Sequence, residues 1–163
     1  MSGSENEFEQ GDSGALNTEL KEAGRMKPGS LIMMKEQFPA KVTAFSTAKP
    51  GKHGSAKAMI TAKDIFTDKQ YDETFGTGDM IPAPIVTKKE MTCICYDDEN
   101  ALQIMDESGE LLEHLNLPTE AHLKDVAASI KRIVDDGSKE CLVTVQKWGD
   151  IEQVIAVREG KDQ

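Results

Sequence analysis

The sequence has few aromatic residues, few cysteines and no long apolar run, and each shortage excludes a class of protein. Aromatic residues make up only 5% of the chain, and no apolar run approaches the length of a membrane span, so we expect no membrane contact. The first residues form neither a basic nor an apolar signal region, which argues against secretion. The three cysteines, Cys93, Cys95 and Cys141, lack the spacing of a disulfide framework and are typical of a reducing compartment. The cytoplasm is therefore the expected location.

Acidic residues outnumber basic ones, and their distribution is uneven. The chain of 163 residues is long enough for one ordinary domain or two small β domains, and its net charge of −10 argues against indiscriminate binding of nucleic acid. No acidic residue occurs from Phe38 through Lys63. Five lysines fall in that stretch: Lys41, Lys49, Lys52, Lys57 and Lys63. We therefore expect one local basic region on an acidic protein.

The N-terminal half changes character near Met26. Residues 1–25 mix Ser, Gly, Asn and acidic residues with few apolar ones, so we expect a disordered acidic tail. Short apolar or alternating runs then predict the strands of a small barrel. These runs are Leu31–Met34, Lys41–Phe45, Lys57–Thr61 and a run from Gln70 onward. Thr67–Gln70 is predicted as a hairpin turn. The proline-rich stretch 81–85 disfavours a central strand and indicates a domain boundary near residues 84–88.

The C-terminal half has the order of an OB fold. Strand-like runs are followed by a helical pattern and two further strands. The strands are predicted at 91–96, 101–105, 110–113, 141–145 and 154–157. The helix lies between the third and fourth of these, with Thr119 as a candidate N-cap and Gly137 at its end. The sequence thus predicts a mainly β protein with one helix in its second domain.

Chemistry is concentrated in the segment Ser46–Lys57, which is predicted to be a long hairpin tip between two strands. Pro50 fixes its own φ, and Pro-Gly fits the central positions of a type II turn. Gly51 and Gly54 flank the pair Lys52 and His53 without side chains of their own. The Lys52 amine is therefore expected to be accessible, and His53 is a candidate for contacting RNA or for stabilising the turn.

Two known phosphate- and RNA-binding motifs match this segment only in part. A phosphate-binding P-loop needs Gly at position 46 and Ser or Thr at position 53, where this chain has Ser46 and His53. The string Gly51–Gly54 satisfies the GXXG pattern of a KH domain, but that loop joins two helices, whereas predicted strands flank this one. From spacing alone, a solvated hairpin with lysines for solubility stays open.

The same segment resembles the eukaryotic translation initiation factor 5A family. The resemblance rests on Ser46–Lys57, Asp64–Thr67, Asp106–Glu110 and Leu115–Pro118, and it extends from about Met26 to the C-terminus. It implies an SH3-like barrel over residues 26–86 and an OB-fold domain over residues 87–163. It further implies that Lys52 becomes hypusine: deoxyhypusine synthase transfers an aminobutyl group from spermidine, and deoxyhypusine hydroxylase adds a hydroxyl. No separately bound cofactor is implied.

The function implied by the resemblance is that of a translation factor. It would bind the ribosome near the E and P sites, contact peptidyl-tRNA through the hypusine, and support peptide-bond formation at stalling sequences such as polyproline, as well as termination. Lys49 and Lys57 would add contacts to RNA phosphates that do not read sequence. The expected location is the cytoplasm, with the nucleus as a second compartment.

Two loop residues differ from the common family pattern. Pro50 stands where the family commonly has Thr, and Ser55 stands where it commonly has a second His. A stiffer loop with one imidazole fewer would change recognition by the two modifying enzymes. The Gly-Lys-His-Gly frame from Gly51 to Gly54 is intact, so Lys52 remains the expected modified residue.

The remaining clusters carry weaker signals. Cys93 and Cys95 are expected on one face of a strand, and without a second cysteine pair they predict no metal site. Three aromatic residues either pack against the domains or stack on bases: they are Tyr71, Tyr96 and Trp148. No catalytic set of residues emerges, so we expect no enzymatic activity. The alternatives are a general single-stranded RNA-binding β protein that acts unmodified and a small-molecule enzyme.

Overall fold

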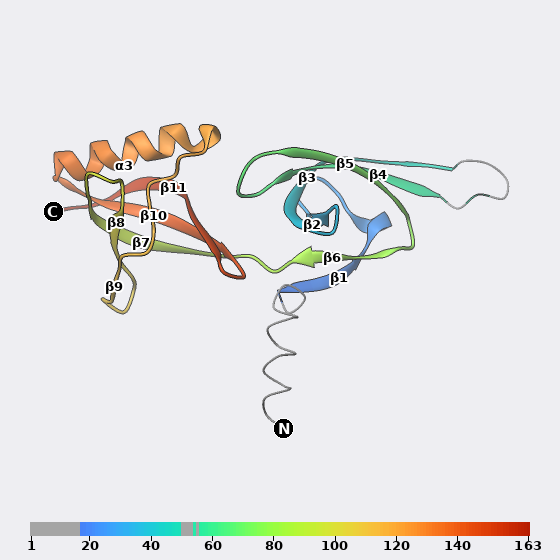
Figure 1. The fold of residues 1–163 in the computed structure, drawn as a ribbon, viewed down its shortest axis with the longest axis horizontal. Helices are drawn as coiled ribbons and strands as arrows, with labels where there is room; N and C mark the ends of the chain where they lie inside the picture. The colour runs from blue at the N-terminus through green and yellow to red at the C-terminus, as the bar shows by residue number, and fades with distance from the viewer. Residues whose placement is uncertain (1–16, 50–53, 55) are drawn as a thin grey trace, which may run out of the picture. The chain divides into compact units, whose positions relative to one another are not determined.

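Two compact units make up the chain in this computed structural model, which describes residues 17–49, 54 and 56–163. The boundary between the units lies between Ile85 and Val86. Each unit is built mainly from antiparallel strands around its own buried core (Figure 1). The predicted mainly β fold class is confirmed. Among the described residues, no helix is long and apolar enough to cross a membrane.

The first unit is organised around a curled sheet with the order β2-β3-β4-β5. The strands are β2 (Leu31–Met34), β3 (Phe38–Ala48), β4 (Lys57–Asp64) and β5 (Gln70–Gly76). Strand β4 shows why this sequence forms a sheet: Ala58, Ile60 and Ala62 are buried, while the residues between them are more exposed. Because successive side chains of a strand point to opposite faces, this alternation gives the sheet one core face and one outer face. The predicted strands are confirmed, and most are longer than predicted.

The N-terminal tail was predicted wrongly for residues 18–25. Thr18–Glu22 form β1, which pairs with β6 (Met80–Pro84), and Ala23–Arg25 form the 3-10 helix η1. Residues 1–16 lie outside the described residues. Composition hid β1 because four of its five residues are polar. Strand β1 is held in place because its main chain pairs with β6 and because Ala23, the residue that follows it, is completely buried. A pattern of polar and apolar residues reveals neither contact.

Proline is compatible with β6 because of the register of this pair. Hydrogen bonds join Ile85 N–H to the Asn17 carbonyl at one end of the pair and Ala23 N–H to the Asp79 carbonyl at the other. Hydrogen-bonded positions of an antiparallel pair recur at every second residue, so Pro82 and Pro84 fall at positions where β1 needs no N–H from them. The expectation that these prolines exclude a central strand agrees with this two-stranded sheet.

The second unit has a sheet with the order β11-β10-β7-β8-β9 and one covering helix. Its strands are β7 (Thr87–Tyr96), β8 (Leu102–Met105), β9 (Leu111–Leu112), β10 (Lys139–Trp148) and β11 (Ile151–Asp162), with α3 (Lys124–Asp136) between β9 and β10. Ile130 and Ile133 of α3 are buried in the same cluster as the inner residues of the sheet. The predicted order of strands and helix is confirmed, and Gly137 ends the helix with a left-handed φ of 75°.

The start of this helix differs from the prediction. Thr119 is not its N-cap: a 3-10 turn, η2 (Ala121–Leu123), precedes α3, and neither element has a side-chain cap. The residue before η2 is Glu120 in an extended conformation. Pro118 and Thr119 therefore belong to the connecting segment, and the turn η2 supplies the entry that a capping side chain supplies in other helices.

The two cysteines of β7 do not share a face as predicted. The register shifts between Cys93, which lies opposite Ile104, and Cys95, which lies opposite Gln103. Such a bulge interrupts the alternation of a strand, so Cys93 is buried whereas Cys95 is exposed. Cys93 instead lies opposite Cys141 of β10. A hydrogen bond with the Cys141 thiol, together with burial, raises the pKa of the Cys93 thiol, which keeps it protonated.

The core of the second unit provides a test of its packing. Ile104 is completely buried, whereas Leu111 is 51% exposed. We expect Ile104→Ala to lower the free energy of unfolding by about 2–5 kcal/mol, because it leaves a cavity, and Leu111→Ala to lower it by much less. Urea unfolding followed by the fluorescence of Trp148 measures both. Equal losses in the two variants would contradict this assignment of the core.

Candidate functional site

The predicted site occupies the connection between β3 and β4. The last paired residues of these two strands are Ala48 and Lys57, which lie at one end of the β3–β4 ladder. Three of the predicted site residues are described, and all three are exposed: Lys49, Gly54 and Lys57. The other four, Pro50, Gly51, Lys52 and His53, lie outside the described residues, as does Ser55. The structure therefore describes both ends of this loop.

A bulge in β3 sets which side chains face outward near the loop. Val42 pairs with Ala62 and Ala44 pairs with Thr61, so Thr43 is an extra residue in β3. Before the bulge, Val42 is buried; beyond it, Ala44 and the alternate residues toward the loop face outward. A bulge also increases the local twist of a strand pair. The direction in which β3 and β4 leave the core therefore depends on Thr43, whose hydroxyl donates to the Thr61 carbonyl (3.2 Å).

The C-terminal end of the loop is attached to a neighbouring turn. Thr77 N–H donates to the Ala56 carbonyl (3.1 Å), which continues the β4–β5 ladder one residue beyond the strands. Thr77 lies in a tight turn in which Asp79 N–H donates to the Gly76 carbonyl (3.0 Å) and Gly76 N–H donates to the Asp79 carboxylate (2.9 Å). Sequence reasoning missed this turn. The string Gly-Thr-Gly-Asp is a turn signal, but nothing in it points to Ala56.

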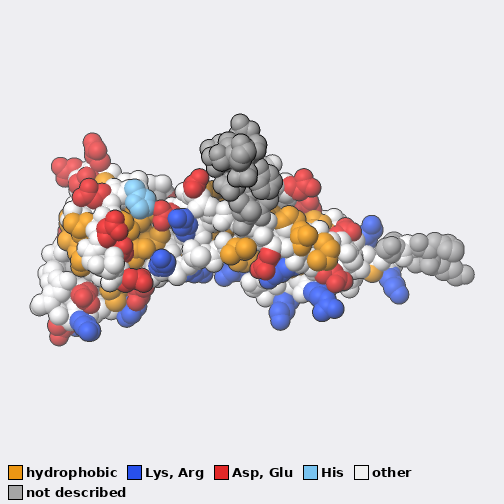
Figure 2. Space-filling model, turned by 90° about the horizontal axis from the view of Figure 1, so that it is seen from below, with side chains coloured by type: hydrophobic (Ala, Val, Ile, Leu, Met, Phe, Trp, Pro, Cys, Tyr) orange, Lys and Arg blue, Asp and Glu red, His pale blue; other side chains and the backbone are white. Residues whose placement is uncertain are grey.

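Acidic residues of β5 and of the β4–β5 turn lie beside part of the basic stretch of the sequence. Lys63, at the end of β4 far from the loop, approaches Asp68 at 3.9 Å. In the middle of β4, Thr61 donates to the Asp72 carboxylate (2.5 Å). At the loop end, by contrast, Lys57 lies opposite the uncharged Gly76. Figure 2 shows basic and acidic side chains interspersed on the face that it draws. Lys57 at the loop end thus has no acidic residue opposite it in β5, whereas Lys63 at the other end approaches Asp68.

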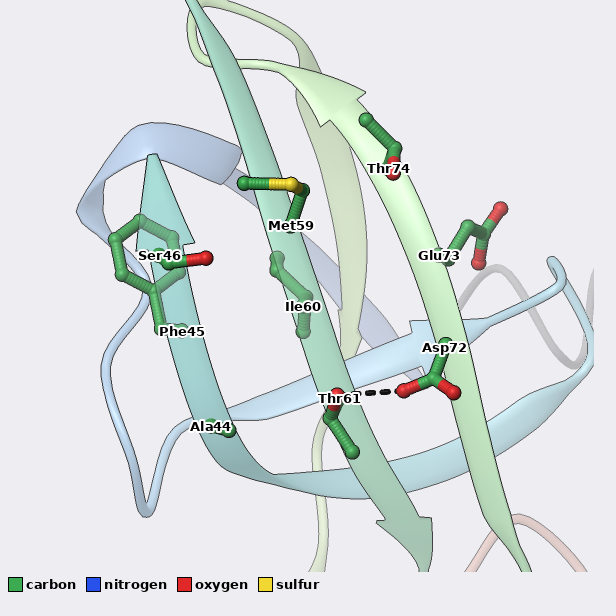
Figure 3. Close-up of a pocket in the computed structure, with 9 residues that line it drawn as sticks. All are labelled: Ala44, Phe45, Ser46, Met59, Ile60, Thr61, Asp72, Glu73 and Thr74. Atoms are coloured by element: carbon green, nitrogen blue, oxygen red, sulfur yellow. Dashed lines mark hydrogen bonds between the residues drawn. The ribbon is translucent and has the colours of Figure 1, made fainter. Parts of the chain in front are cut away.

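A shallow hollow lies on the sheet beside this hairpin and bears on the enzymatic alternative. Figure 3 shows it between β3, β4 and β5, with Met59 among small and polar side chains. Its lining is Ala44, Phe45, Ser46, Met59, Ile60, Thr61, Asp72, Glu73 and Thr74. This set contains no His, Cys, Lys or Arg, and Glu73 accepts a hydrogen bond from the Lys35 N–H (2.7 Å). Within the hollow the Thr61 hydroxyl donates to the Asp72 carboxylate, and the lining places no histidine or cysteine beside this pair.

Two aromatic candidates for base stacking are engaged within their own units. Tyr71 stacks on Phe38 with ring centroids 4.5 Å apart. The Tyr96 hydroxyl donates to the Asp135 carboxylate (2.9 Å), and this hydrogen bond raises the pKa of Tyr96. The Lys131 ammonium lies 5.6 Å from the centroid of the same ring. These contacts agree with packing roles for both tyrosines.

Two of the other motifs of the resemblance form turns, and the third, Leu115–Pro118, pairs with residues 100–102 through its backbone. In Asp64–Thr67, the buried Asp64 carboxylate accepts the N–H groups of Phe66 (2.8 Å) and Thr67 (3.0 Å), and the following Asp68 has a left-handed φ of 68°. In Asp106–Glu110, the Ser108 hydroxyl donates to the Asp106 carboxylate (2.7 Å) and, with backbone N–H groups, lowers the pKa of Asp106. The first of these turns joins β4 to β5, which confirms the predicted hairpin.

Two family models match most of the chain. Residues 16–79 match the model described as translation initiation factor 5A-like, N-terminal, and residues 85–158 match eukaryotic elongation factor 5A hypusine, DNA-binding OB fold. The chain belongs to the eukaryotic translation initiation factor 5A family. This is a family of translation factors with a hypusine site, and the predicted two-domain fold with a C-terminal OB domain is thereby confirmed.

Relatives and solved structures agree with this assignment. The Dictyostelium discoideum eukaryotic translation initiation factor 5A is 36% identical over 93% of this chain and 91% of its own length. The Drosophila melanogaster factor is 33% identical over 94% and 93%, respectively. A solved family member from Naegleria fowleri is 36% identical, with a TM-score of 0.79 over 87% of this chain and 99% of its own. The Methanococcus jannaschii structure, at 24% identity and a TM-score of 0.65, shares the fold.

The Asp64 turn can be tested separately from the loop, because it lies at the opposite end of β4. We expect Asp64→Ala to lower the free energy of unfolding by about 1–3 kcal/mol, since two N–H groups lose their acceptor. Asp64→Asn keeps an acceptor oxygen and is expected to cost less. Chemical denaturation followed by circular dichroism measures both. An unchanged stability in Asp64→Ala would show that the turn does not depend on this carboxylate.

Proposed function

We propose that this chain is a translation factor that acts through a hypusine formed on Lys52. In this proposal it binds the ribosome near the E and P sites and promotes peptide-bond formation at stalled sequences such as polyproline, and also termination. The observation that carries the proposal is the end of the β3–β4 ladder at Ala48 and Lys57, where Lys49, Gly54 and Lys57 are exposed, in a chain that belongs to a family with a hypusine site. Lys52 follows Gly51 in the sequence segment that this hairpin presents.

Modification takes place in two steps on the Lys52 amine. Deoxyhypusine synthase transfers the aminobutyl group of spermidine to the Lys52 nitrogen, which breaks a C–N bond of spermidine and releases 1,3-diaminopropane. Deoxyhypusine hydroxylase then converts a C–H bond of the added chain to C–OH, with molecular oxygen as the oxidant. The chain is the substrate of both enzymes and performs no catalysis itself. Lysine suits this role because its amine is a substitutable nitrogen on a flexible stem, whereas the guanidinium of arginine is not. Pro50 and Ser55 are the positions at which recognition by these enzymes would differ from that of other family members.

Electrostatics explains the use of a single long cationic side chain. A protein with a net charge of −10 is repelled by RNA at long range, so close approach requires a region of its surface that is locally positive. The modified side chain adds reach and a second amine, which lets it approach the backbone of peptidyl-tRNA. Lys49 and Lys57, both exposed at the ends of the loop, add phosphate contacts that do not depend on sequence. The site of action is the cytoplasm, with the nucleus as a second compartment.

Replacing Lys52 with arginine tests the requirement for modification. Lys52→Arg keeps the positive charge but removes the amine that accepts the aminobutyl group. We expect loss of function in cells, no mass shift at residue 52, and a melting temperature close to that of the wild-type protein. Lys69→Arg is the matched control, because Lys69 is an exposed lysine at the other end of β4 and β5.

Peptide mass spectrometry of protein from its own cells separates the proposal from the alternative of an unmodified RNA-binding protein. If Lys52 is unmodified in protein from its own cells, or if Lys52→Arg has wild-type activity, the proposal is wrong and simple electrostatic binding of RNA is favoured. That alternative also predicts that Lys57→Ala reduces the salt dependence of RNA binding by about one phosphate contact, regardless of the state of Lys52.

A further inference from the structure

Three segments that are distant in the sequence meet at the turn Gly76–Asp79. On one side, η1 donates two hydrogen bonds to it: Ala23 N–H to the Asp79 carbonyl (2.9 Å) and Gly24 N–H to the Thr77 carbonyl (2.8 Å). On the other side, the turn donates Thr77 N–H to the Ala56 carbonyl at the end of the loop (3.1 Å). Thr77 thus links η1 to the loop through its own two backbone groups.

Gly24 leaves no room for a side chain at this contact. A Cβ at position 24 would lie 2.8 Å from the Thr77 carbonyl oxygen and 3.0 Å from the Thr77 Cβ. The first of these distances is shorter than real Cβ contacts, and the atom it meets belongs to the backbone, so a rotamer change cannot relieve it. Any larger residue at position 24 must therefore separate η1 from the turn or displace Thr77.

The burial of η1 decides whether η1 or the turn Gly76–Asp79 is displaced by a larger residue at position 24. Ala23 is completely buried in the core of the first unit, together with Met26 on the other side of Gly24. Moving η1 would disturb this core, whereas the turn is exposed at Gly78 and Asp79. The displacement is therefore passed to the turn, and from Thr77 N–H to Ala56, whose carbonyl is the last point at which β4 is tied to β5 before the loop.

We propose that Gly24 is a positioning residue for the loop that carries Lys52: it allows η1 to lie against Thr77, and Thr77 then fixes the Ala56 end of the loop. This inference rests on the proposed function, since its kinetic readout is modification of Lys52. The segment that composition assigned to a disordered tail thus supports the site. Deoxyhypusine synthase is the partner for which this support matters, because a substrate loop held in place binds with a smaller loss of conformational freedom.

The experiment compares Gly24→Ala with Gly78→Ala in the full-length chain. Gly78 is the matched control, because it lies in the same turn, lacks a positive φ, and offers a Cβ open space with no neighbouring atom within 4 Å. With deoxyhypusine synthase and labelled spermidine, we expect Gly24→Ala to raise the KM for the protein substrate about tenfold with kcat nearly kept, since a substrate that is less preorganised loses more conformational freedom on binding. Gly78→Ala is expected to match the wild type.

A structural readout accompanies the kinetics. The Thr77 amide should exchange its hydrogen faster in Gly24→Ala than in the wild type or in Gly78→Ala, whereas amides in the middle of β4 should not change. A wild-type KM in a folded Gly24→Ala protein would overturn the inference. So would wild-type protection of the Thr77 amide.

A second variant decides the question if Gly24→Ala does not fold. Asp79→Ala removes the carboxylate that accepts the Gly76 N–H and so loosens the same turn without adding a clash. A raised KM with faster exchange at Thr77 supports the inference, and a wild-type KM despite faster exchange at Thr77 overturns it. Wild-type protection of the Thr77 amide from hydrogen exchange in Asp79→Ala also contradicts the inference. If the wild-type chain itself is not modified at Lys52, the proposed function fails, and the Thr77 exchange still tests the link from Gly24 to Ala56.

Discussion

The antiparallel ladder between β3 and β4 is the constraint on which the first unit depends. Its inward residues, among them Val42 and Ile60, form the centre of the core. Its end at Ala48 and Lys57 determines where the loop leaves the sheet. The bulge at Thr43 joins these two roles, because it reverses which residues of β3 face the core and adds twist on the way to the loop. Core packing and presentation of the loop are therefore set by one pair of strands.

The ladder alone leaves the loop end of β4 without support beyond Lys57, and the N-terminal segment contributes to that support. Helix η1 is held by the burial of Ala23 and lies against the turn that contains Thr77. This turn is in contact with Ala56. A segment with a largely polar composition thus becomes part of the architecture, because its main-chain groups find partners on β6 and on the turn.

The charged residues of the first unit are also distributed differently in the fold than in the sequence. The acid-free stretch from Phe38 to Lys63 is one region in the sequence, but β5 brings Asp72 beside its middle, and Asp68 approaches Lys63. What remains without an opposing charge on β5 is the end at Lys57. The second unit forms a separate core around Ile104 and Ile130.

Sequence by itself determined the mainly β class, the strands other than β1 and β6, the order of the OB unit and the end of its helix at Gly137. These features depend on local alternation and turn residues, both of which are visible in short windows. Only the tertiary structure decided the pairing of β1 with β6, the separation of Cys93 from Cys95 by a bulge, and the link from Gly24 through Thr77 to Ala56. The physical reason is the same in each case: backbone hydrogen bonds and close approaches between distant segments are not encoded by side-chain polarity, so no periodicity in the sequence reveals them.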